Sequence, residues 1–116
     1  MAEEGIRLFD AGNFWLAHEA LEEAWKSESG PARTLYIGIL QAGVTYLHIE
    51  RQNFIGAAKM FERCNRYLAS LPDICRGVNV KQLRKDLGIV MQAAGKLGPE
   101  HLDQFNTNLF QPILRT

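Results

Sequence analysis

The stretch TLYIGILQAGVTYLHI, from Thr34 to Ile49, contains no charged residue over 16 positions. Its apolar side chains recur on all sides of a helical projection, which is typical of a helix buried nearly all round. Gly38 and Gly43 lower helix propensity, so we expect neighbouring helices to approach closely there. Because the run is shorter than the roughly 20 apolar residues that cross a bilayer, it predicts the central helix of a globular protein, over about 32–51.

Helical periodicity continues on both sides of this central helix. The further expected helices cover residues 2–10, 14–28, about 54–71 and about 80–97, with N-caps at Asn13, Asn53 and Asn79. Residues 72–78 are expected to form a loop, and the tail 106–116 to be extended and to pack back on the body. The sequence therefore predicts an all-α fold, an antiparallel bundle of about five helices in a single domain, residues 1–116.

A weak internal repeat supports helical hairpins. Residues 13–22 and 53–62 share the pattern Asn-Phe-x-x-Ala-x-x-x-x-Glu. The pattern combines a helix cap, an aromatic side chain and a small residue where a second helix can cross closely. It is similar to tetratricopeptide-type hairpins, so we expect tetratricopeptide-like packing of the first two hairpins.

Composition restricts the partners. The 13 basic and 13 acidic residues cancel, so nothing in the charge balance favours nucleic acid or an anionic membrane, and neither is expected as a partner. A small ligand, a partner peptide or a second copy of the chain remains open. Cys64 and Cys75 form no CxxC pair and are expected to be reduced thiols of a cytoplasmic protein.

Chemistry is expected on the helix over 14–28, where His18, Glu22 and Trp25 form the pattern HxxxExxW. Successive rotations of about 100° place six side chains in one arc of about 120°, in the order Phe14, Leu21, Trp25, His18, Glu22 and Trp15. An imidazole and a carboxylate within an apolar arc are costly unless they are paired. We therefore predict a buried polar site at this pair.

The central helix carries a matching polar seam. Gln41, Thr45 and His48 lie within about 60° of one another on its surface. Two helices that are joined by a short turn pack antiparallel, so the seam is expected to meet His18 and Glu22. Trp15 and Trp25 are expected to be core residues or walls of the cavity.

Three interpretations of this pair remain open. It could be a hydrogen-bonded structural pair completed by Gln41, Thr45 or His48. His18 and Glu22 could instead be ligands of a divalent metal, zinc or ferrous iron, with His48 or Gln41 completing the sphere. They could also act as general acid and base without metal.

A fourth reading, from a different class of protein, does not involve the pair. It is a non-enzymatic interaction module that holds a partner peptide in an apolar groove between helical hairpins.

The HxxxExxW pattern resembles the signature of a bacterial and archaeal family, domain of unknown function 309. The resemblance extends to Gly38-Ile39-Leu40-Gln41-Ala42, to Leu71-Pro72 and to the tail Gln111-Pro112-Ile113-Leu114. It implies a small helical bundle and a metal at the motif, but no reaction. Gln52 stands where the family has glycine, so the turn there is expected to differ slightly.

Overall fold

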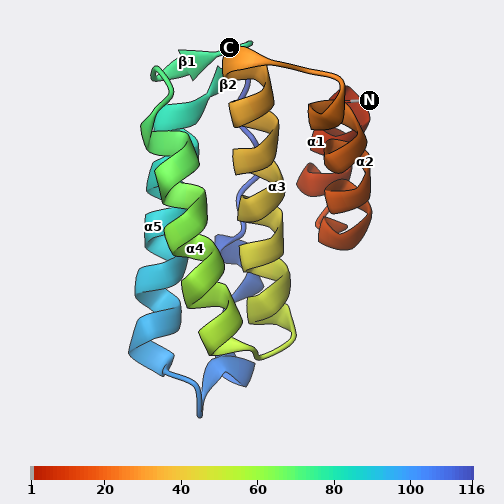
Figure 1. The fold of residues 1–116 in the computed structure, drawn as a ribbon. Helices are drawn as coiled ribbons and strands as arrows, with labels where there is room; N and C mark the ends of the chain where they lie inside the picture. Colours follow the sequence, from red (N-terminus) through yellow and green to blue (C-terminus); the bar gives the residue numbers. More distant parts are fainter. Residues whose placement is uncertain (1) are drawn as a thin grey trace.

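The central helix of the fold is α3, which spans Gly30–Glu50. The computed structural model describes residues 2–116. Helix α2 (Phe14–Lys26) packs along one side of α3, and α4 (Phe54–Ala69) packs along another side (Figure 1). The apolar stretch of the sequence thus lies where it was predicted, in a helix packed between two others.

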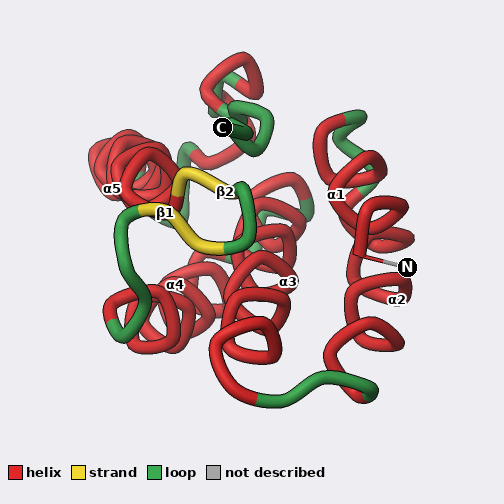
Figure 2. Tube along the Cα trace, turned by 90° about the horizontal axis from the view of Figure 1, so that it is seen from above, coloured by secondary structure: helices red, strands yellow, loops and turns green. Residues whose placement is uncertain are grey.

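The other two helices complete an up-and-down arrangement. Helix α1 (Ala2–Asp10) pairs with α2, and α5 (Val80–Leu97) follows α4 and lies beside it. Viewed from above, α1 and α2 form a layer on one side of α3, while α4 and α5 lie on the other (Figure 2). The prediction of an all-α bundle of five antiparallel helices is confirmed.

The helix boundaries are set by capping residues and glycines. Asn53 and Asn79 cap α4 and α5 as predicted, because their side-chain oxygens accept the N–H groups of Gly56 and Gln82, each at 2.9 Å. Asn13 occupies the position before α2 but forms no such bond.

The turns adjust the predicted boundaries by a few residues. Helix α2 ends at Lys26 instead of 28, and α3 begins two residues before 32. Gln52 has a φ of 59°, in the left-handed region. The turn after α3 thus has the backbone that the family's glycine would suit.

The segment that was predicted to be a loop, 72–78, contains a small hairpin. Strand β1 (Ile74–Cys75) pairs antiparallel with β2 (Val78–Asn79). The intervening Arg76 and Gly77 have φ values of 51° and 78°, as a two-residue hairpin turn requires. With two residues each, the strands are too short for an alternating pattern to reveal them, so this prediction was wrong.

The C-terminal tail returns over the bundle, as predicted. After two short 3₁₀ turns, η1 (Leu102–Gln104) and η2 (Thr107–Leu109), it runs back beside α5 towards the hairpin. The Ile113 N–H donates to the Asp10 carboxylate at 2.7 Å, and Arg115 forms an ion pair with Glu3 at 2.6 Å. The tail therefore ties α1 to the hairpin end of the bundle.

One apolar core runs through the bundle. At its centre the buried ring of Tyr46 packs among Phe9, Phe14 and Phe110, one aromatic side chain from each of α1, α2 and the tail. Cys64 and Cys75 are free and buried. Among residues 2–116, no helix has both the length and the apolar character that a membrane crossing needs.

Candidate functional site

A surface cleft opens over α3 between α2 and α4. It has a volume of about 320 Å³. Its walls come from three helices: His18, Glu22 and Trp25 of α2, Arg33, Ile37, Leu40 and Gln41 of α3, and Tyr67 of α4. The cleft brings the three residues of the HxxxExxW pattern together with one residue of the polar seam, Gln41.

The predicted burial of the pair is wrong. The side chains of His18 and Glu22 are 25% and 39% exposed. Exposure rises along the predicted arc, from the buried Phe14 to Trp15, which is 49% exposed. The side of α2 that faces the core is centred on Leu21. Residues at one end of the predicted arc are therefore buried, and residues at the other end are exposed to solvent.

His18 and Glu22 nevertheless face each other. The His18 Nε2 lies 3.6 Å from Oε2 of Glu22, one helical turn away. The other carboxylate oxygen of Glu22 lies 3.3 Å from the Lys26 ammonium. Glu22 is thus shared between an imidazole and a lysine at the edge of the cleft, and it can orient the imidazole without being committed to it.

The His18 ring is held from its far side. It stacks on Trp15 with the ring centroids 5.2 Å apart and the planes 12° apart. Its Nδ1 is buried without a protein hydrogen-bond partner, as is Oε1 of Gln41. Since Nε2 faces a carboxylate and Nδ1 faces no acceptor, we expect the neutral ring to carry its proton on Nε2. Trp15 is an exposed stacking partner that does not line the cleft, and thus neither the core residue nor the cavity wall that was predicted.

Arg33 was not predicted to belong to the site. Its guanidinium carbon lies 4.8 Å from the Trp25 ring centroid, in a cation–π contact. Within residues 2–116, Arg33 forms no ion pair or side-chain hydrogen bond. The one sequence feature that could have indicated its place in the cleft is its position in the first turns of α3, since these lie opposite the end of the antiparallel α2. The cation therefore lies in the cleft with its hydrogen-bond donors unused.

Two residues of the predicted seam lie outside the cleft. Thr45 is buried and donates to the Gln41 carbonyl at 2.8 Å. His48 lies with its Nδ1 3.3 Å from the Asn53 amide nitrogen, at the far end of α3. Gln41 and His48 are seven positions apart, which corresponds to about 10 Å along the helix axis. The seam therefore continues past the cleft, and the prediction that all of it meets His18 was wrong.

The described residues do not fit a metal centre. Across 2–116, no three His, Cys, Asp or Glu side chains come together as a group that could hold a metal ion. Zinc sites in proteins use three or four ligands, drawn from Cys, His, Asp and Glu side chains, whereas this cleft offers two of this kind, His18 and Glu22. Of the two residues predicted to complete the sphere, Gln41 lines the cleft and His48 lies at the far end of α3.

Replacing the Glu22 carboxylate is expected to have little effect on stability. Because both side chains of the pair are partly exposed, Glu22→Gln should change the free energy of unfolding by less than about 1 kcal/mol. A buried structural pair would instead lose about 3–5 kcal/mol when one partner is removed. Urea denaturation followed by circular dichroism measures this, with Glu23→Gln as the exposed control. A loss of about 3–5 kcal/mol in Glu22→Gln would show that the pair has a structural role.

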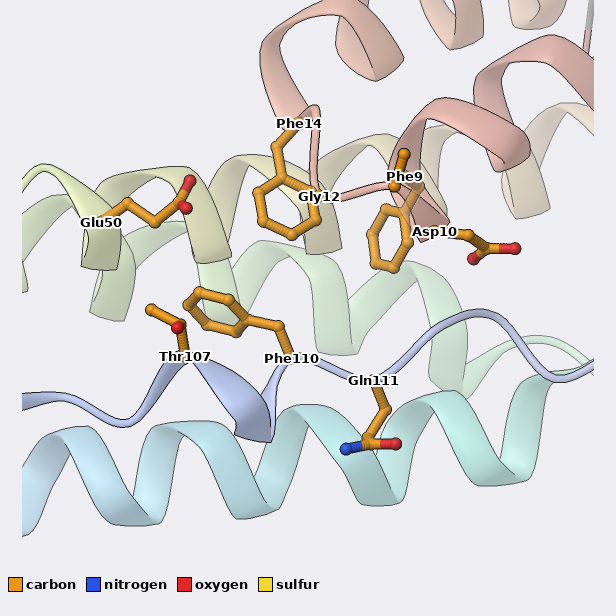
Figure 3. Close-up of a pocket in the computed structure, with 9 residues that line it drawn as sticks. Phe9, Asp10, Gly12, Phe14, Glu50, Thr107, Phe110 and Gln111 are labelled. Carbon is orange, nitrogen blue, oxygen red and sulfur yellow. The ribbon is translucent and has the colours of Figure 1, made fainter.

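A second cleft, of about 330 Å³, opens beside the aromatic core. The rings of Phe9, Phe14 and Phe110 lie between Asp10 on one side and Glu50 on the other (Figure 3). Burial raises the pKa of both carboxyl groups. Sequence reasoning missed this cleft because it forms only when the tail folds back. As the two carboxylates lie on opposite sides of the rings, they do not form a catalytic pair.

Comparison with known proteins finds a family and a relative that resemble this sequence. A protein of Aquifex aeolicus (strain VF5) that carries the name "Uncharacterized protein" is 28% identical over 94 residues. The match covers 78% of this chain and 28% of the relative, so the chain spans little more than a quarter of the relative's length. Residues 2–60, which include α1, α2, α3 and most of the cleft, match one family. The chain belongs to the family described as domain of unknown function (DUF309).

Proposed function

We propose that the protein binds a small organic anion, such as a carboxylate on an apolar or aromatic body, in the cleft between α2, α3 and α4. The observation that carries this proposal is the presence of an unpaired guanidinium, Arg33, beside the His18–Glu22 pair in one cleft. Ligand sites are commonly apolar hollows of about 300–1,000 Å³ with a few polar groups, and this cleft is at the lower end of that range.

Arg33 is suited to hold the anion. A guanidinium presents several N–H donors in a fixed plane and can bind a carboxylate through two parallel hydrogen bonds. Its contact with Trp25 fixes one face of the group and leaves the donor edge free. An arginine with a carboxylate partner of its own would first have to break that pair.

The remaining lining suits an uncharged ligand body. Ile37, Leu40 and Tyr67 supply apolar and aromatic surface opposite Trp25. His18 can donate from Nε2 to a polar group of the ligand while the stack on Trp15 holds the ring. The proposal requires neither a reaction nor a metal. It does not require a cytoplasmic location either, although the two free thiols support one.

A titration with benzoate tests the proposal. In ¹H–¹⁵N NMR spectra, benzoate should shift the amide resonances around the cleft with a dissociation constant on the order of 1 mM, as expected for a ligand of this size. Benzamide, the uncharged analogue of the same shape, should bind much more weakly. Arg33→Gln should reduce benzoate affinity by about tenfold or more.

A matched variant controls for nonspecific charge effects. Lys85→Gln removes an exposed cation on α5 and should leave benzoate binding unchanged. Equal binding of benzoate and benzamide, or unchanged affinity in Arg33→Gln, would exclude Arg33 as the anion site. Shifts confined to residues away from the cleft would exclude the cleft itself.

The alternative is a non-enzymatic module that holds a partner peptide. The observation that favours it is the exposure of Trp15, Leu16 and Ile55, the last of which is 66% exposed. The longer Aquifex relative supports it too, because the matched region there is joined to further protein. A partner would then shift resonances around Trp15 and Ile55, and Ile55→Ser would weaken it without changing benzoate binding.

A further inference from the structure

A groove runs between α5 and the C-terminal tail, separate from the cleft at His18. It consists of two adjoining hollows of about 280 and 180 Å³, both lined by Asp86 of α5 and Gln111 of the tail. Figure 3 shows the Gln111 side chain pointing from the tail towards α5. The other walls are mostly apolar: Ile89 and Leu109 in the larger hollow, and Gln82, Pro112, Ile113 and Leu114 in the smaller one.

Asp86 is a buried carboxylate without a cation. The residue is 7% exposed, and its only side-chain hydrogen bond within residues 2–116 is from Nε2 of Gln82 to Oδ1, at 2.8 Å. No lysine, arginine or histidine of the described chain forms an ion pair with it. Burying an ion without a counter-ion is costly, so this position needs an explanation.

Within residues 2–116, the neighbouring Tyr46 hydroxyl does not form a hydrogen bond with Asp86. The Tyr46 hydroxyl is fully buried and has no hydrogen-bond partner. The pKa of Tyr46 is raised, mainly by burial and further by the negative charge of Asp86, so the two groups are near enough to interact. The second oxygen of Asp86, Oδ2, is not among the buried atoms that lack partners, and the residue lines both hollows of the groove.

The two glutamines of the groove also present acceptors. The amide nitrogen of Gln82 donates to Asp86, and that of Gln111 donates to the Asn108 carbonyl at 2.9 Å. These bonds fix the orientation of both amides, and neither Oε1 accepts a hydrogen bond from the described residues 2–116. Asp86, Gln82 and Gln111 therefore supply three oxygen acceptors, and each glutamine amide keeps one further N–H.

We propose that this groove binds a primary ammonium group carried on a short alkyl chain. An ammonium has three N–H donors and no acceptor, which matches a carboxylate and two amide oxygens. The chain of the ligand would lie against Ile89 and Leu109. A divalent metal fits less well, because calcium and magnesium take six or more oxygen ligands and no metal-holding group of His, Cys, Asp or Glu exists within 2–116.

The probe for this site is n-butylammonium, with n-butanol as its uncharged analogue. In ¹H–¹⁵N spectra the ammonium should shift resonances of α5 and the tail with a dissociation constant in the millimolar range, roughly that expected of so small a ligand, and butanol should not. Asp86→Asn keeps the shape of the side chain and should weaken binding at least about tenfold. Asp103→Asn, which changes an exposed carboxyl in η1, should leave it unchanged.

A second variant protects the test against a folding defect. Ile89 is an exposed wall residue, so Ile89→Lys should fold and place an internal ammonium over the groove, which blocks the probe while Asp86 remains. Equal shifts from butanol, or full binding by Asp86→Asn, would overturn the proposal. Benzoate binding is measured at a different site, so either proposal can fail without the other.

The ammonium could come from a free amine or from a lysine side chain. Titration with 1,4-diaminobutane and with Nα-acetyl-lysine methylamide separates these sources, because the better-matched probe saturates the same resonances at the lower concentration. If neither probe shifts the resonances that butylammonium shifts, the groove does not recognise alkylammonium groups in general, and the proposal fails.

Discussion

Tyr46→Ala is expected to lower the free energy of unfolding by about 3–5 kcal/mol, the range for a large aromatic side chain removed from a packed core. The Tyr46 ring is fully buried. Its centroid lies 4.6, 5.4 and 5.7 Å from those of Phe110, Phe14 and Phe9. Removing it leaves a cavity where α1, α2, α3 and the tail meet, and the surrounding rings cannot all move to fill it.

Tyr46→Phe is the matched control for that experiment. It keeps the ring and removes only the hydroxyl, which is buried without a hydrogen-bond partner. Leaving such a group unpaired costs about 1–3 kcal/mol, so Tyr46→Phe should leave stability unchanged or raise it. Urea denaturation of both variants measures the contrast. A large loss in Tyr46→Phe would show that the hydroxyl forms a hydrogen bond in solution.

Helical periodicity explains why the fold could be predicted. The uncharged stretch of α3 and the caps at Asn53 and Asn79 are local signals, and each depends on residues within one or two turns. The hairpin was missed because its cause is two left-handed residues, Arg76 and Gly77. Arginine is an unusual residue for that conformation, so the sequence carried only half of the turn signal.

The candidate site was harder to predict because its geometry depends on how helices are rotated and where they end. The arc of α2 was right in order, but the helix faces the core with its Leu21 side, which leaves His18 and Glu22 at the surface. The cleft lies at one end of α3, so it includes Gln41 and excludes His48. Arg33 was missed because it belongs to no polar pattern in the sequence, and only its place at the start of α3 pointed to the cleft.

The second large effect is expected at the crossing of α3 and α4. A Cβ atom placed on Gly38 would lie 2.6 Å from Cδ2 and 3.2 Å from Cγ of Leu68, which is itself fully buried. The Cys64 thiol also contacts this backbone, donating to the Gly38 carbonyl at 3.2 Å. Gly38→Val should therefore destabilise the protein by about 2–3 kcal/mol through overpacking, despite the better helix propensity of valine.

Gly88 provides the control, because it lies in α5 and a Cβ there would meet nothing within 4 Å. Gly88→Ala should raise stability by about 0.5–1 kcal/mol, since only helix propensity changes. If the cost at Gly38 comes from Leu68, the double variant Gly38→Val/Leu68→Ala should lose clearly less than the sum of the two single variants. Additive losses would place the strain in the backbone of α3, and the close approach of α3 to α4 would then not be the reason for glycine at this position.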